Sequence, residues 1–144
     1  MSKVKRKLTT ILATDCVGFS KRMDENEELT LENLKACRSI IDPQIKEFGG
    51  RIFYTAGDSV IAEFESPVEC VNAAIGFQKA INDRNNTLSE ESQLDWRVGI
   101  HLDDVIIEGD NVYGNGVNIA ARLETACSPC LLYTSDAADE VLGG

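Results

Sequence analysis

The chain has 144 residues, with 43% hydrophobic and 26% charged side chains, which is the balance of one ordinary globular domain rather than of a disordered segment. Its 24 Asp and Glu residues against 14 Lys and Arg give a formal net charge of −10, so it repels a phosphate backbone and nucleic acid is not expected as the main partner. Its apolar runs are far shorter than the roughly 20 residues that span a bilayer, so we expect no membrane span in this segment.

The first third of the chain predicts a strand followed by a long helix. Residues 8–16 are mostly apolar and predict a buried strand. Apolar residues then recur every three or four positions over 34–48, which indicates a helix. Because Pro43 lies inside this pattern, we expect a kink or a restart there, with Asp42 as a local cap.

A hairpin is predicted directly after this helix. Gly49-Gly50 is typical of the left-handed residue that ends a helix. Residues 51–56 and 60–64 are rich in β-branched and aromatic side chains, and Gly57-Asp58 between them suits a tight turn. The two segments therefore predict antiparallel neighbours.

The next helix has the clearest start signal in the chain. Ser66 is a good cap, Pro67 suits the first helical position, and Glu69 lies three residues after the cap. The apolar stripe that follows continues the helix to about Asn85, and a polar loop then leads into a strand over 94–102.

A short hairpin and a further helix complete the pattern. Residues 105–107 and 112–113 flank a turn at Gly109-Asp110, and Gly114 to Gly116 begin a helix that runs through Ala126. The order β-α-β-β-α-β predicts an α+β fold with a ferredoxin-like core, an extra hairpin and an extra helix. Such a fold has an antiparallel-rich sheet with helices over one face.

The last fifteen residues look foreign to the domain. From Cys130 onward the run resembles a translated sequencing-library adapter, so we assign residues 1–129 to a domain truncated at its C-terminal end and 130–144 to a non-native tail. The C-terminal strands would then be missing. The alternative is a genuine C-terminal segment. The five cysteines, an odd number read as reduced thiols, predict a cytoplasmic protein.

Two aspartates are candidates for a metal site. Asp15 ends the first predicted strand and Asp58 lies in the hairpin turn, and the β-α-β-β order makes those two strands neighbours. Two carboxylates about 4 Å apart repel by roughly 4 kcal/mol at an effective dielectric of 20, so a divalent cation between them would be stabilising. The alternative is that each aspartate only satisfies its own turn.

Two further groups suit an anionic substrate. Val17, Gly18, Phe19 and Ser20 form a loop between strand and helix, where backbone N–H groups can approach a phosphate. Asn118 and Arg122 are four apart on the last predicted helix and share a face, where an amide and a guanidinium can stabilise growing negative charge. The alternative is a solvated face with Arg122 in a surface ion pair.

Three segments together resemble the class III nucleotidyl cyclases, the adenylate/guanylate cyclase family of the bacterial type. The resemblance covers about residues 7–129, and its motifs are residues 12–20 (LATDCVGFS), 49–59 (GGRIFYTAGDS) and 108–124 (EGDNVYGNGVNIAARLE). It implies conversion of ATP, or GTP, to a 3′,5′-cyclic nucleotide and pyrophosphate, in cyclic-nucleotide signalling.

The resemblance also implies the roles of individual residues. Two Mg²⁺ or Mn²⁺ ions are held by Asp15, Asp58 and the main-chain carbonyl of Cys16, and the amides of residues 17–20 hold the phosphates. Asn118 orients the ribose and Arg122 stabilises the α-phosphate. Each active site is shared between the two subunits of a homodimer.

The positions that read the base depart from the family pattern. The family usually has lysine and aspartate where this chain has Tyr54 and Asn111. Tyrosine can stack or form a hydrogen bond and asparagine both donates and accepts, but neither supplies a charge. Adenylate cyclase is therefore the first hypothesis. The alternatives are a guanylate or relaxed-specificity cyclase, and a degenerate cyclase-like module that binds nucleotide or dimerises without turnover. The related diguanylate cyclases have a different hairpin motif.

Overall fold

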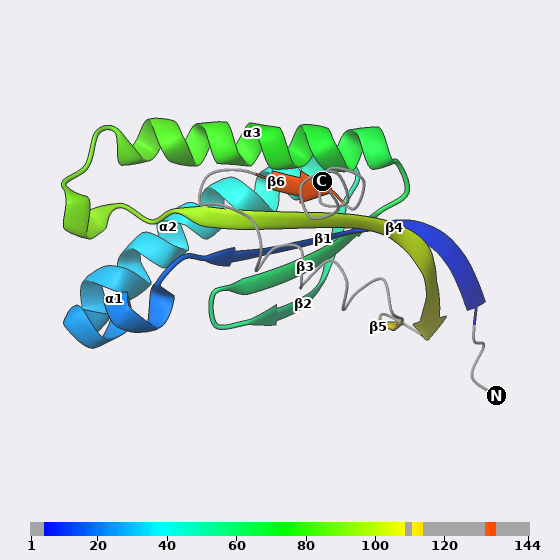
Figure 1. Ribbon diagram of the computed structural model, residues 1–144, viewed down its shortest axis with the longest axis horizontal. Helices are drawn as coiled ribbons and strands as arrows, with labels where there is room; N and C mark the ends of the chain where they lie inside the picture. Colours follow the sequence, from blue (N-terminus) through cyan, green and yellow to red (C-terminus); the bar gives the residue numbers. More distant parts are fainter. Residues whose placement is uncertain (1–4, 109–110, 114–131, 135–144) are drawn as a thin grey trace, which may run out of the picture.

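The computed structural model describes residues 5–108, 111–113 and 132–134. They form an α+β fold in which the helices cover one face of a single sheet (Figure 1). The elements in chain order are β1 (Lys5–Cys16), α1 (Phe19–Glu25), α2 (Glu27–Glu47), β2 (Arg51–Ala56), β3 (Ser59–Phe64), α3 (Pro67–Asn85), the short 3₁₀ helix η1 (Glu90–Ser92), β4 (Trp96–Glu108), β5 (Asn111–Tyr113) and β6 (Leu132–Thr134).

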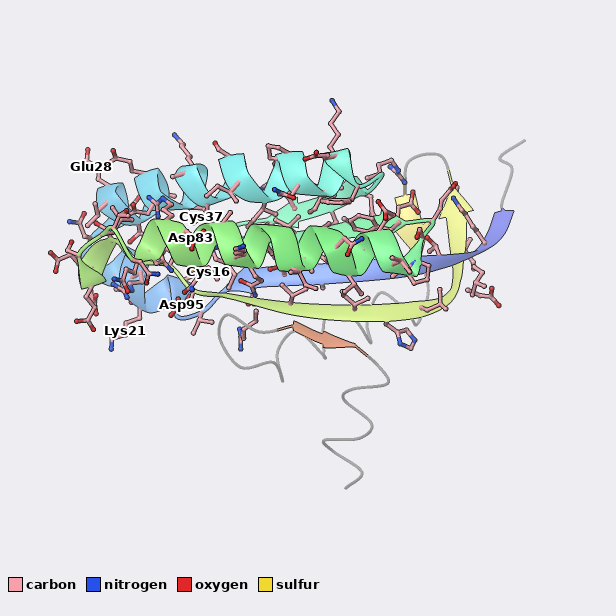
Figure 2. The ribbon with its side chains drawn as sticks, turned by 90° about the horizontal axis from the view of Figure 1, so that it is seen from above. Cys16, Lys21, Glu28, Cys37, Asp83 and Asp95 are labelled. Carbon is pink, nitrogen blue, oxygen red and sulfur yellow. The ribbon has the colours of Figure 1, made fainter. Side chains whose placement is uncertain are left out.

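The sheet has β1 at its centre. Its order is β2-β3-β1-β4-β5, and β6 pairs in parallel with β4. Strands β2, β3, β1 and β4 are antiparallel neighbours, which confirms the predicted β-α-β-β-α-β order. Helices α2 and α3 lie side by side over one face, as Figure 2 shows from above.

Both faces of the central strand are buried. Ile11, Leu12 and Ala13 are 0%, 0% and 1% exposed. Leu12 and its cross-strand partner Ala62 belong to the core beneath α2 and α3, so even-numbered residues of β1 face the helices. Odd-numbered residues of β1 face the opposite side of the sheet, and this alternation decides where the candidate site lies.

Helix α2 differs from the prediction at Pro43. The helix runs without interruption from Glu27 to Glu47, so the predicted restart is wrong. Asp42 is not a cap, because its carboxylate accepts two hydrogen bonds from the Arg38 guanidinium, at 2.8 and 2.9 Å. Proline forfeits one helical hydrogen bond, and the burial of Ile41 and Ile45 on either side of it offsets that loss.

The ends of both long helices follow the predicted chemistry. Gly49 has a φ of 82°, and the N–H groups of Gly49 and Gly50 donate to the carbonyls of Lys46 and Ile45 at 3.1 and 2.8 Å. This is the left-handed ending that satisfies the last carbonyls of a helix. At the start of α3 the Ser66 side chain accepts from the Glu69 N–H at 3.2 Å. Helix α1 was not predicted as a separate element.

Strand β4 is longer than the two segments predicted for it. It runs unbroken over Trp96–Glu108, whereas the sequence predicted strands over 94–102 and 105–107. The reason is its partner: β1 begins at Lys5 and pairs with β4 as far as Ile107, so the ladder continues through Asp103-Asp104. Strand β5 pairs with β4 as the predicted second arm of the extra hairpin.

Two predictions concern the C-terminal part of the chain. The helix expected over 114–126 lies outside the described residues. Strand β6 falls within the segment assigned to a non-native tail, and that assignment stays a prediction. Among the helices that the structure describes, none combines the length and hydropathy needed to cross a bilayer.

Candidate functional site

Two aspartates lie at the same rim of the sheet. Asp15 lies near the end of β1, and Asp58 lies in the turn between β2 and β3, the strand that pairs with β1. Gly57 makes this turn possible with a φ of 57°. The backbone N–H of Cys16 donates to Oδ2 of Asp58 at 2.8 Å, which fixes the Asp58 carboxylate beside the end of β1. The structure therefore brings the two acids together from distant parts of the sequence.

The electrostatics of Asp58 favour a nearby cation. Burial raises the pKa of the Asp58 carboxyl, and the negative charge of Asp15 raises it further. Hydrogen bonds from the N–H groups of Cys16 and of Asp58 itself, together with the Arg97 guanidinium, act in the opposite direction without reversing the shift. A divalent cation beside Asp58 would favour the ionised form of its carboxyl and so act against the effect of burial.

Asp15 has a partner that the sequence analysis missed. Arg97 lies directly opposite Asp15 in the β1–β4 ladder. Its Nε and one terminal nitrogen donate to Oδ1 of Asp15 at 3.1 and 3.0 Å, and the same terminal nitrogen lies 3.2 Å from Oδ2. The strand register is what pairs these residues, and no motif in the sequence contains that register.

The surroundings of the Cys16 thiol disfavour its ionised form. Burial raises its pKa to about 12, and the charges of Asp58 and Asp15 add to the effect. The thiol lies in the core and donates to the Val17 carbonyl at 3.7 Å. The predicted contribution of the Cys16 main-chain carbonyl to a metal site stays a prediction.

The predicted phosphate loop leads directly into α1. Gly18 caps this helix with a φ of 66°, and Phe19 is its first residue. The N–H of Val17 donates to the carbonyl of Asp95 at 2.8 Å and is therefore engaged. The amides of Gly18, Phe19 and Ser20 are the ones that remain for the predicted role.

A β-bulge sets the direction of Tyr54. Ile52 pairs with Ala62 and Tyr54 with Ile61, so Phe53 is an extra residue in β2. Because Ile61 pairs with Ala13, Tyr54 faces the same side of the sheet as the odd-numbered residues of β1, Asp15 among them. Without the bulge Tyr54 would face the helices.

The remaining predicted site residues are Asn111, Asn118 and Arg122. Asn111 lies in β5, opposite Glu108 of β4, and nothing further is described of its side chain. Asn118 and Arg122 lie outside the described residues. Their approach to the aspartates stays a prediction.

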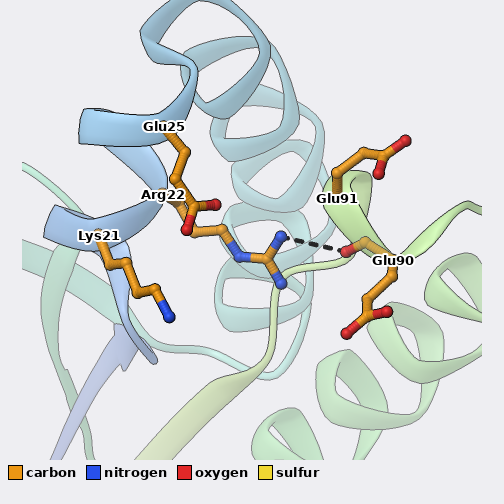
Figure 3. A pocket seen from close by; sticks show the side chains of 5 residues that line it. All are labelled: Lys21, Arg22, Glu25, Glu90 and Glu91. Atoms are coloured by element: carbon orange, nitrogen blue, oxygen red, sulfur yellow. Dashed lines mark hydrogen bonds between the residues drawn. The ribbon is translucent and has the colours of Figure 1, made fainter.

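A polar pocket is lined by charged side chains. It has a volume of about 290 Å³, lies between α1 and η1, and is lined by Lys21, Arg22, Glu25, Glu90 and Glu91 (Figure 3). The Arg22 guanidinium donates to the carbonyl of Glu90 at 3.1 Å across it. Three carboxylates make this pocket a poor host for a triphosphate, and none of the predicted site residues lines it.

The donors at the rim suit a hard divalent cation. In the part of the chain that the structure describes, no group of three or more His, Cys, Asp or Glu side chains could by itself hold a metal. Mg²⁺ and Mn²⁺ prefer oxygen ligands, and oxygen is what the carboxylates of Asp15 and Asp58 and the carbonyl of Cys16 offer. A Mg²⁺ site needs few protein ligands, because water and substrate phosphates complete its coordination. The residues present therefore fit such an ion.

Comparisons with known proteins agree with the motifs. The family profile described as "Adenylate and Guanylate cyclase catalytic domain" matches residues 2–143, so the match includes most of the segment assigned above to a tail. A Rhizobium meliloti (strain 1021) protein named as a candidate adenylate cyclase 3 is 36% identical over 142 residues. That stretch covers 98% of this chain and 24% of the relative, so the chain spans about a quarter of the relative's length.

Solved structures show the same architecture. An adenylate/guanylate cyclase/hydrolase from Silicibacter pomeroyi is 32% identical with a TM-score of 0.87, over 98% of this chain and 83% of that one. A structure titled as a non-canonical dimeric guanylyl cyclase domain from the aquatic fungus Blastocladiella emersonii has a TM-score of 0.77 at 16% identity, over 96% of this chain and 85% of that one. At that identity the second similarity shows the fold alone.

Proposed function

Because the chain belongs to the adenylate and guanylate cyclase catalytic domain family, we propose that it converts ATP to 3′,5′-cyclic AMP and pyrophosphate. The observation that supports this most is the meeting of Asp15 and Asp58 at one rim of the sheet, where burial and Asp15 raise the pKa of Asp58. A reaction on a triphosphate needs a cation, and two neighbouring carboxylates at this rim favour one.

The proposed site holds two Mg²⁺ or Mn²⁺ ions on Asp15, Asp58 and the Cys16 carbonyl. When bound, such ions lower the pKa of the ribose 3′-hydroxyl and neutralise the leaving pyrophosphate. The protein supplies mainly positioning and charge stabilisation, because phosphoryl transfer needs little covalent help from side chains. The N–H of Cys16 holds the Asp58 carboxylate in place for this role.

The remaining roles are assigned to residues from both subunits of a proposed homodimer. The amides of Gly18, Phe19 and Ser20 hold the phosphates of ATP. Asn118 of the mate orients the ribose and its Arg122 stabilises the charge on the α-phosphate. Under this arrangement neither subunit alone holds a complete site, so a single subunit is inactive. We place the enzyme in the cytoplasm.

A second candidate, a guanylate or relaxed-specificity cyclase, is favoured by the residues at the base positions. Tyr54 is on the site face of the sheet and offers a ring and a hydroxyl, neither of which distinguishes adenine from guanine by charge. Asn111 can donate to one base and accept from the other. A degenerate module without turnover is disfavoured because both metal aspartates are retained.

Product formation tests the proposal. The chain, and a version extended with the gene's own residues past Pro129, are incubated with Mn²⁺ and either ATP or GTP, and cyclic nucleotides are separated by chromatography. We expect cyclic AMP from ATP with the extended version, and its loss when Asp58→Ala is introduced into that version. Equal turnover of GTP would favour the relaxed-specificity enzyme, and nucleotide binding without any product would favour the non-catalytic module.

A further inference from the structure

The Asp15 carboxylate is already occupied by a side chain of its own chain. The Arg97 guanidinium reaches both carboxylate oxygens, with three contacts of 3.0–3.2 Å. The two side chains are 24% and 23% exposed, so water screens the pair only in part. A guanidinium contact of this kind occupies part of the acceptor capacity of the carboxylate, which a metal ion would also use.

The position of this pair is fixed by the backbone. Asp15 and Arg97 are cross-strand partners in the longest ladder of the sheet, so neither side chain has to move far to find the other. The Thr14 hydroxyl donates to the main-chain carbonyl of Arg97 at 2.7 Å, which adds a second link between the same strands. The guanidinium also opposes the rise in the pKa of Asp58, so its positive charge acts on both acids.

We propose that Arg97 is a positioning residue that competes with the divalent cation for Asp15. In the metal-free protein it neutralises the carboxylate and holds it in one orientation. A bound cation takes the same oxygens, and Arg97 gives up part of its contact. Arg97 thus sets the metal affinity of the site and keeps the two acids together when no cation is bound. This inference rests on the proposed metal site at Asp15 and Asp58.

The competition has a definite sign. Removal of Arg97 frees both oxygens of Asp15 and also removes a positive charge that repels the cation, so both effects tighten metal binding. The same change leaves Asp15 beside Asp58 without a counter-charge, so the metal-free protein becomes less stable. A residue that merely supported the fold would lower stability without tightening metal binding.

The test measures Mn²⁺ binding to the full chain by the loss of the free-ion signal in electron paramagnetic resonance. Arg97→Met keeps the apolar stem and is expected to lower the Mn²⁺ dissociation constant about tenfold. The thermal midpoint without metal falls, and the rise on adding Mn²⁺ is larger than in the wild type. Arg38→Met is the matched control, because it breaks the similar bidentate pair with Asp42 on α2 and is expected to leave the dissociation constant unchanged.

A second variant covers the case in which Arg97→Met does not fold. Arg97→Lys keeps the charge but cannot span both oxygens, and its dissociation constant is expected between those of the wild type and Arg97→Met. Unchanged or weaker Mn²⁺ binding in the folded Arg97 variants would overturn the competition. Asp58→Asn separates the two proposals: if it does not weaken Mn²⁺ binding to the wild-type chain, the metal site itself is wrong.

Discussion

Replacement of Tyr54 by alanine tests whether the bulge in β2 serves the active site. Tyr54 is 52% exposed, so truncation removes about half of the 1.5–3 kcal/mol that a fully buried side chain contributes, or about 1 kcal/mol. Stacking of an aromatic side chain on a base contributes about 1–3 kcal/mol, which corresponds to a loss of about 5- to 150-fold in kcat/KM. We expect losses in this range for both ATP and GTP, with a small change in Tm.

The neighbouring residue provides the control. Thr55 is also exposed on β2 but pairs with Val60, so it lies on the helix side of the sheet. Thr55→Ala is expected to change kcat/KM by less than about twofold. The Thr55 side chain is exposed and lies on the face of the sheet opposite the site. The assay is Mn²⁺-dependent cyclisation of each nucleotide, with thermal unfolding beside it. Equal losses in the two variants, or full activity in Tyr54→Ala, would refute the argument from the bulge.

Three further predictions concern stability. Ser66→Ala is expected to lower the unfolding free energy by about 1 kcal/mol in chemical denaturation, through loss of the cap on the Glu69 N–H; an unchanged value would contradict the cap. Gly50→Ala is expected to cost about 1–3 kcal/mol in the same assay, because a Cβ would lie 2.5 Å from the Phe64 ring; a loss below about 0.5 kcal/mol would show that the ring yields. Burial raises the pKa of the Cys70 thiol from 9.0 to about 12. Above pH 9 the unfolded chain therefore loses a proton that the folded chain keeps. The free energy of unfolding is expected to fall by about 1.4 kcal/mol per pH unit toward pH 12. Cys70→Ala should remove this contribution of one proton from the slope of unfolding free energy against pH, measured by chemical denaturation between pH 9 and 12. An unaltered slope would show that the Cys70 thiol is not its source.

Features set by local chemistry could be predicted from the sequence. The cap at Ser66, the left-handed ending at Gly49 and the turn at Gly57 each depend on residues within a few positions of one another. The approach of Asp15 to Asp58 also follows, because the order of the elements makes β1 and β3 neighbours. The fold class and the metal hypothesis both depend on these features.

Features set by pairing between distant segments could not be predicted. The extension of β4 through Asp103-Asp104 depends on its ladder with the start of β1. The contact of Arg97 with Asp15 depends on the register of that ladder, and the direction of Tyr54 depends on a bulge that appears only when β2 is paired with β3. Pro43 was misjudged because burial around it outweighs the lost hydrogen bond.

The central claim is that Asp15 and Asp58 bind the same divalent ions, and a double-mutant cycle on Mn²⁺ affinity tests it most directly. The dissociation constant is measured for the wild type, Asp15→Asn, Asp58→Asn and the double variant. Shared ions predict that each single variant weakens binding by at least about tenfold and that the double variant is little weaker than either. Effects that simply add, or binding that survives both changes, would contradict the account.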